Sequence, residues 1–216
     1  MPYDFMELFD HVFESGEEKI IGRMTEILSI AKRANKEVLR IVNRRSRSIV
    51  PSKQMEKESD TKVFTLSSMA ASGAVSPNIL DDVLNLIDQE DSIVDAIFNL
   101  ARELLRYSIS DKKTSEILKG RLLTILGLAG EALDEFAIML STDDVARIRR
   151  SREKIEQLEQ EGDELKDFLL DFAYKSRMDF KAFYYISEIA HKSDDILDSC
   201  ENSADIYMSI MDAIAT

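Results

Sequence analysis

The sequence predicts an all-α protein of six long antiparallel helices, arranged as two tandem three-helix bundles. Apolar residues recur at the three- and four-residue spacing of amphipathic helices through almost all of the 216 residues. The sequence lacks the period-two alternation, bounded by Asn-Gly or Asp-Gly turns, that would indicate strands. Shifting the sequence by 103 residues places acidic positions of the first half on acidic positions of the second, which indicates an internal repeat.

Proline, glycine and serine delimit the first three helices. An apolar stripe predicts the first helix over residues 17–42. Val50-Pro51 either begins the second helix or kinks one already running, because proline fits a first turn and breaks an interior. Ser72-Gly73 is a stop signal for that helix. Ser76-Pro77 begins the third, with proline at the first helical position, and the apolar pattern continues to about Arg106.

Capping residues delimit the other three helices. Ser110-Asp111 begins the fourth, which continues to about Leu140. The run from Ser141 to Asp144 caps the fifth, which ends near Ser176. Asp179 starts the sixth helix, which continues almost to the C-terminus.

One shift of 103 residues carries two separate acidic motifs onto their partners. Each motif is an acid followed four residues later by Asp, and the four copies are Glu56/Asp60, Asp91/Asp95, Glu159/Asp163 and Asp194/Asp198. The two motifs of each half lie about thirty residues apart and recur in one register. We therefore expect two three-helix units, residues 1–110 and 111–216.

These acids form a candidate metal site in each unit. Carboxylates four apart on a helix share one face and repel each other. Two antiparallel helices would gather four of them, which is unfavourable unless protons or multivalent cations neutralise the charge. Hard or borderline divalent and trivalent ions suit such a carboxylate set. The alternative is an ordinary solvated acidic face, but Asp91 lies beside the apolar stripe of its helix.

The second unit has the larger set of acids. Glu201 and Asp205 extend the row that Asp194 and Asp198 begin, whereas the first unit has Phe98 and Arg102 at the equivalent positions. We therefore expect the second site to be the better metal site.

The excess of acidic residues limits the classes of partner that the protein can bind. The chain has 28 Lys and Arg against 41 Asp and Glu, a formal net charge of -13. Such a surface repels nucleic acids and anionic lipids, and favours cations, metal ions or basic protein patches. The N-terminal sequence has no signal-peptide pattern and no apolar run is long enough to span a membrane, so we expect a cytoplasmic protein that reaches a membrane only through a partner.

The four motifs together resemble the E/D-x-x-x-D signatures of the PhoU-like family. Glu56-Lys-Glu-Ser-Asp60 and Glu159-Gln-Glu-Gly-Asp163 are similar to the signature on the second helix of each PhoU-type repeat. Asp91-Ser-Ile-Val-Asp95 and Asp194-Asp-Ile-Leu-Asp198 are similar to the signature on the third. The segment from Val75 through Ala96 resembles the shorter phosphate-transporter-accessory branch of the family.

The resemblance implies a non-enzymatic regulator of inorganic phosphate transport that acts on a membrane phosphate transporter or on the phosphate-sensing kinase. It also implies a multinuclear metal cluster on each unit, with iron or zinc as first candidates and nickel, manganese or magnesium as others. The implied metal ligands are Glu56, Asp60, Asp91, Asp95, Glu159, Asp163, Asp194, Asp198, Glu201 and Asp205. Phosphate ion and a second copy of the chain are further candidate partners.

Two other function classes stay open. A ferritin-type storage or redox bundle would use Glu188-Ile-Ala-His191, but it needs a second Glu-x-x-His, and Leu8 stands three before His11. A metal-free scaffold would present its acidic rows to a basic partner.

Other conspicuous residues have simpler interpretations. Arg44-Arg45-Ser46-Arg47 and Arg149-Arg150-Ser151-Arg152 are interpreted as solvated helix faces that offset nearby acids, or as contacts for phosphate or an acidic partner. Cys200 is expected to be a small core residue.

Overall fold

The computed structural model describes the backbone of residues 5–214 and the side chains of residues 19–213. Its elements, in chain order, are α1 (Phe5–Val42), α2 (Val50–Met69), the π-helical turn η1 (Ala70–Ala74), α3 (Leu80–Leu104), α4 (Lys112–Met139), α5 (Val145–Lys175) and α6 (Phe180–Ile214). The predicted all-α fold of six long helices is confirmed, and no strand occurs between residues 5 and 214.

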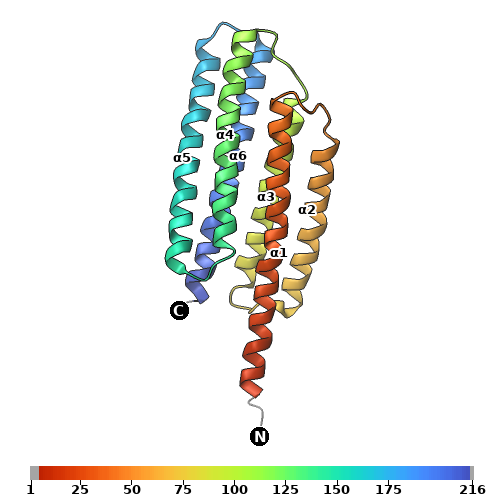
Figure 1. Cartoon of the computed structure of the whole chain (residues 1–216), viewed down its shortest axis with the longest axis vertical. Helices are drawn as coiled ribbons and strands as arrows, with labels where there is room; N and C mark the ends of the chain where they lie inside the picture. The colour runs from red at the N-terminus through yellow and green to blue at the C-terminus, as the bar shows by residue number, and fades with distance from the viewer. Residues whose placement is uncertain (1–4, 215–216) are drawn as a thin grey trace.

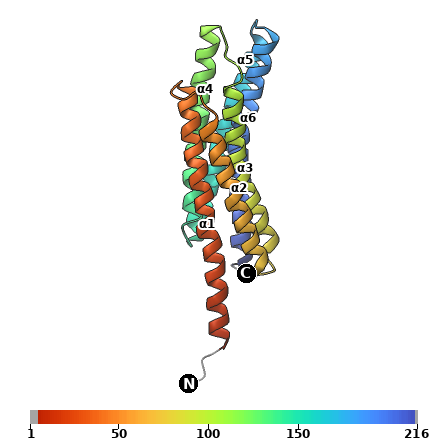
Figure 2. The same cartoon turned by 90° about the vertical axis from the view of Figure 1, so that its right-hand side faces the viewer.

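The helices form an elongated bundle in which neighbours along the chain are antiparallel (Figure 1). Helices α3 and α6 are central, since α3 packs against α1, α2 and α6, and α6 packs against α3, α4 and α5. Helices α2 and α5 lie on opposite flanks, and α1 also packs against α4. A view turned by 90° shows the same common long axis (Figure 2).

One apolar core runs through both halves of the chain. Its buried side chains come from all six helices, and Ile27, Ile97, Phe136 and Ile186 are fully buried examples. The two predicted three-helix units therefore meet along α3 and α6 without a polar layer that separates their cores. The division at residue 110 stays a prediction.

Most of the predicted helix boundaries agree with the structure. Asp111 caps α4, where its carboxylate accepts a hydrogen bond from the Thr114 backbone N–H at 2.7 Å. Asp144 caps α5 in the same way through Ala146 N–H at 2.9 Å. Helix α2 begins at Val50 with Pro51 in its first turn, which settles the start that the sequence left open. Gly73 has a φ of 97°, as expected for the glycine at a helix stop.

Two predicted helix starts were wrong. Pro77 does not open α3, because it lies in a turn in which Ile79 N–H donates to the Ser76 carbonyl oxygen at 3.1 Å, and α3 begins only at Leu80. Helix α1 begins at Phe5 instead of Glu17. Gly16 lies inside α1, where a Cβ would stand 2.5 Å from the Ala74 carbonyl oxygen, so its small size lets α1 pass close to η1.

The core contains an unpartnered carboxyl group. Glu90 on α3 is 1% exposed, and neither of its carboxyl oxygens has a hydrogen-bond partner. Burial raises the pKa of Glu90 well above its usual range, because folding disfavours the charged form of this carboxyl. At the equivalent position of the second half stands Ser193, whose hydroxyl is satisfied by the Ala190 carbonyl at 2.9 Å. The burial of this carboxyl is therefore a feature of the first half.

We predict that Glu90→Leu stabilises the protein by about 1–3 kcal/mol at pH 7, because it removes an unsatisfied buried polar group. Below about pH 4.5 the carboxyl is protonated in both folded and unfolded states. As pH rises, the unfolded chain releases the proton while the folded chain retains it, so the cost of folding grows. Urea unfolding at pH 4.5 and pH 8 should show the larger gain at pH 8. The exposed Glu153→Leu is the control, and an equal Glu90→Leu gain at both pH values would contradict the explanation.

Candidate functional site

The first acidic cluster consists of Glu56 and Asp60 on α2 with Asp91 and Asp95 on α3. The structure brings these four predicted residues together across two packed helices. Burial raises the pKa of Asp95, and the charges of Glu56 and Asp60 raise it further. Burial also raises the pKa of Asp91, with additional contributions from Asp95 and Asp60. The four carboxylates are therefore close enough to destabilise each other's charged forms.

A buried hydroxyl positions one member of the first acidic cluster. Ser59 on α2 is fully buried and donates to Asp91 Oδ1 at 2.8 Å, which partly offsets the rise in the Asp91 pKa. Within the described residues, no Lys, Arg or His forms an ion pair with any of the four acids. The first acidic cluster thus concentrates negative charge that the chain itself leaves without a cation.

The second acidic cluster consists of Glu159 and Asp163 on α5 with Asp194, Asp198, Glu201 and Asp205 on α6. Burial raises the pKa of Glu159 to about 7, and the neighbouring charges of Glu201, Asp163, Asp198 and Asp194 add to the rise. Burial also raises the pKa of Glu201, and the charge of Asp205 raises it further. The structure therefore brings together the six residues that the sequence predicted.

A lysine lies inside the second acidic cluster. Lys166 Nζ forms ion pairs with Asp163 and with Asp194 Oδ2, the latter at 2.5 Å, and its side chain is 21% exposed. Burial raises the pKa of Asp194 to about 6, although the Lys166 hydrogen bond lowers it. Burial alone would lower the pKa of Lys166, but its bonds to Asp163 and Asp194 raise it above the usual range. An ammonium group therefore bridges α5 and α6 where the sequence predicted a metal ion.

An arginine pairs with the last of the four α6 acids in the second acidic cluster. Arg152 on α5 pairs through Nε with Asp205 Oδ1 at 2.6 Å and also pairs with Glu156. It lowers the pKa of Glu201, against the larger effect of burial. Asp205, predicted as a metal ligand, is an arginine partner in this structure.

These two cations distinguish the clusters. The sequence analysis missed Lys166, whereas it included Arg152 in a basic helix face that offsets nearby acids, as its pairs with Asp205 and Glu156 show. In the 103-residue register, Val63 stands at the position of Lys166 and Ile49 at the position of Arg152. Arg102 is no substitute in the first half, because its guanidinium lies 5.6 Å from the ring of Phe98. Lys166 follows Asp163 by three residues on one helix face, so a repeat comparison that included basic residues could have found it.

The side chains as they stand do not enclose a metal ion. Among the described residues, no group of three or more His, Cys, Asp or Glu side chains is placed to hold one. The donor chemistry of the first acidic cluster fits a hard cation, because four carboxylates adjoin one another without an internal counter-charge. In the second acidic cluster Asp194 Oδ1 is buried without a partner, but Lys166 neutralises the neighbouring oxygens.

The remaining candidate residues lie outside both clusters. Glu188 pairs with Lys192 at 3.7 Å, and His191 is exposed. His11 lies outside the described side chains. Cys200 is fully buried, which confirms the predicted core role, and burial raises its pKa to about 12.

Two solved structures from Shewanella oneidensis MR-1 share this fold. One, described as a PhoU-like phosphate regulatory protein, has a TM-score of 0.62 at 15% identity, over 90% of this chain and 99% of that one. The other, a PhoU-like protein, has a TM-score of 0.62 at 14% identity, over 89% and 96% of the two chains. No protein-family model matches the chain, and no curated protein matches its sequence. At these identities the likeness establishes the helical-bundle fold.

We predict that Glu159→Gln stabilises the metal-free protein at pH 7.5 by about 1 kcal/mol, a value reduced for solvent screening of a partly exposed group. The raised pKa means that folding disfavours the charged form, so the penalty develops as pH rises from about 4.5 through about 7. Thermal unfolding in EDTA should show the gain at pH 7.5 and almost none at pH 4.5. Glu161→Gln, on an exposed residue of the same helix, is the control, and an equal gain there would contradict the cluster explanation.

Proposed function

We propose that this chain is a non-enzymatic, metal-dependent regulator of inorganic phosphate transport. The observation that carries the proposal is the pair of acidic clusters, related by the internal repeat, on a fold shared with PhoU-like structures. One of those structures is described as a phosphate regulatory protein. The phosphate-transporter-accessory branch, suggested by the segment from Val75 through Ala96, is part of the same proposal.

The regulator would act from the cytoplasm on a membrane-embedded partner. None of the helices between residues 5 and 214 combines the length and apolar character that crossing a bilayer requires. We propose a phosphate transporter or the phosphate-sensing kinase as that partner. The ferritin-type alternative receives no support from Glu188 and His191, because Glu188 pairs with Lys192.

We propose that the first acidic cluster is the principal metal site. This order is opposite to the sequence expectation, which favoured the second because it has more acids. The pairing of the acids supports this order. Lys166 and Arg152 already occupy acids of the second acidic cluster, whereas the four acids of the first have no ion-pair partner within the described residues. A multivalent ion at the first acidic cluster would neutralise its carboxylates and hold α2 against α3. Carboxylate oxygens suit iron, zinc, manganese or magnesium, with nickel as a further candidate.

We expect elemental analysis of protein purified without chelator to find metal bound mainly at the first acidic cluster. Asp91→Asn with Asp95→Asn should remove most of the metal, because it halves the local carboxylate charge. Asp194→Asn with Asp198→Asn should remove little. Lys166→Met should increase the metal content, since it frees Asp163 and Asp194.

Two results would contradict this metal assignment. One is a wild-type protein without metal whose melting temperature is unchanged by EDTA. The other is a larger metal loss from the α6 double variant than from the α3 double variant.

Phosphate uptake tests the physiological role separately. We expect cells that lack the protein to show altered uptake of radiolabelled phosphate, and the wild-type chain to restore it. The Asp91→Asn, Asp95→Asn variant should restore it poorly while accumulating to the same level in the cell. Unchanged uptake without the protein would refute the transport role, whatever the metal content proves to be.

A further inference from the structure

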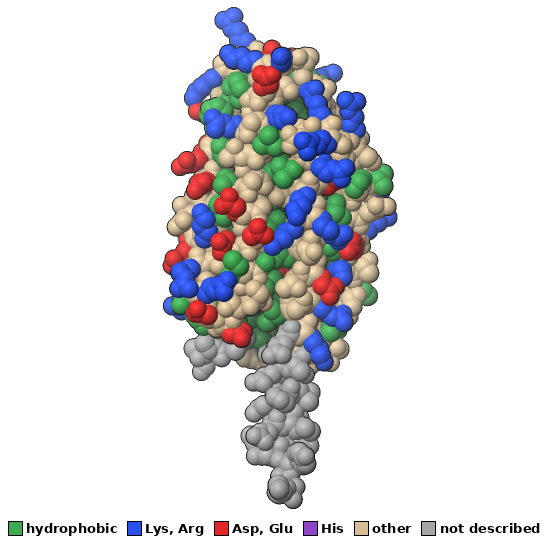
Figure 3. Space-filling view, viewed as in Figure 1, with side chains coloured by type: hydrophobic (Ala, Val, Ile, Leu, Met, Phe, Trp, Pro, Cys, Tyr) green, Lys and Arg blue, Asp and Glu red, His purple; other side chains and the backbone are tan. Residues whose placement is uncertain are grey.

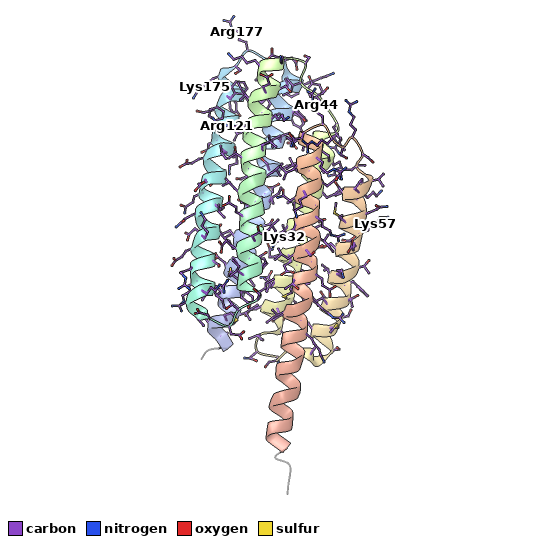
Figure 4. All side chains as sticks on the ribbon, in the orientation of Figure 1. Lys32, Arg44, Lys57, Arg121, Lys175 and Arg177 are labelled. Atoms are coloured by element: carbon purple, nitrogen blue, oxygen red, sulfur yellow. The ribbon has the colours of Figure 1, made fainter. Side chains whose placement is uncertain are left out.

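A basic cavity lies at the end of the bundle where the α1–α2 and α3–α4 connections meet. It is open to the surface, has a volume of about 580 Å³ and is lined by residues of α1, α3, α4, α6 and both connections. Four cationic side chains line it: Arg44 and Arg47 from the α1–α2 connection, Arg106 after α3, and Lys119 on α4. Arg44 is labelled in the upper part of the molecule in Figure 4, beside the upper end of α1.

The lining contains no acid among the described residues. Its other polar side chains are the hydroxyls of Ser46, Ser108, Ser115, Tyr107 and Tyr185. Leu104, Leu118 and Leu122 supply an apolar wall. Cationic and hydroxyl donors without a competing carboxylate are suited to an anionic ligand.

The surface around the cavity is positively charged, although the protein as a whole is strongly negative. Segments 40–53, 102–121 and 171–181 contain fourteen of the 28 Lys and Arg residues but only five of the 41 Asp and Glu. These segments form the upper end of the bundle in Figure 1. The space-filling view shows Lys and Arg gathered over this upper part, with acids more frequent below (Figure 3). A cationic region on a chain of net charge -13 would attract anions toward the cavity.

Local contacts hold part of the cavity wall in place. Arg106 pairs with the buried Glu103 at 2.7 Å. Tyr185 Oη donates to the Leu104 carbonyl oxygen at 3.4 Å. The rings of Tyr107 and Tyr185 pack edge-on, with their centroids 5.3 Å apart. By contrast, Arg44, Arg47 and Lys119 form no ion pair within the described residues, so their charges are free to bind a ligand.

Arg44 has a backbone conformation that favours glycine. Its φ of 55° is the only positive value at a non-glycine position in the described part of the chain. Glycine is usual at this point after a helix, so an arginine here carries a local backbone strain. Its backbone N–H donates to the Ile41 carbonyl oxygen at 2.8 Å, which fixes the turn beside the cavity.

We propose that this cavity binds a nucleotide-sized organic phosphate with at least two phosphate groups, of the nucleoside polyphosphate class. Inorganic phosphate would fill only a small part of the volume and would leave the apolar wall without a contact. The phosphates would contact Arg44, Arg47 and Lys119. The apolar wall and Tyr107 would contact the uncharged part of the molecule. This proposal involves neither acidic cluster, so it can fail while the proposed function stands.

Calorimetric titration of the full chain with ATP tests the site. EDTA and 100 mM salt exclude metal bridging at the acidic clusters and suppress weak general attraction. We expect one saturable site, with weaker binding of tripolyphosphate and much weaker binding of inorganic phosphate. No binding of ATP at millimolar concentration would overturn the proposal. Tripolyphosphate binding as tightly as ATP would overturn the assignment of an organic ligand.

Variants at the cavity locate the binding. Arg44→Gly should weaken ATP binding roughly tenfold, as expected for one lost charge-assisted contact, without lowering the melting temperature. Lys119→Ala should weaken it by a similar factor. Arg45→Ala is the matched control, because Arg45 carries the same charge in the same turn but does not line the cavity. An equal loss with Arg45→Ala would show general electrostatic attraction and overturn the cavity assignment.

Discussion

The packing of α3 against α6 is the constraint on which the rest of this structure depends. Each of these helices is covered on one side by the other and on the remaining sides by helices of its own half. The side of α3 that carries Asp91 and Asp95 is therefore turned toward α2, and the side of α6 that carries Asp194 and Asp198 toward α5. Both acidic clusters are positioned by apolar side chains that take no part in them, such as Ile97 and Ile186.

The sequence predicted the helices well because their physical causes are local. Asp111 and Asp144 cap with their own side chains, and Gly73 adopts a conformation that few other residues tolerate. Pro77 was assigned wrongly because a proline fits a turn as well as a first helical turn. The gathering of acids was also predictable, since four-residue spacing fixes a helix face. The pairing of Lys166 with Asp163 was also within reach, because the two are three residues apart on one helix. Its pairing with Asp194 was not, because these residues are 28 apart in sequence and meet only in the packed structure.

The two clusters have similar acids on similar helix pairs but differ in how those acids are compensated. Four acids of each half occur at corresponding positions in the 103-residue register, but one half has Lys166 and Arg152 where the other has Val63 and Ile49. Ser59, which orients Asp91, corresponds to Gly162, where a Cβ would stand 2.3 Å from Leu197 Cδ1. The second half thus uses this position for close α5–α6 packing, and the first uses it to position a carboxylate. A few side chains therefore distinguish a helix pair whose acids pair with its own Lys and Arg from one whose acids can bind an external cation.

The basic upper end makes the charge of the molecule uneven along its length, which orients it near a negatively charged surface. Fourteen Lys and Arg residues stand against five acids there, and the remainder of the chain carries 36 acids against fourteen cations. An elongated body with this distribution has a permanent electric dipole moment along its long axis. In the field of a negatively charged surface it experiences a torque that turns the basic end toward that surface. The torque acts within one Debye length, about 8–10 Å at physiological salt. Approach is thus oriented before any contact forms, and the acidic flanks are held away from that surface.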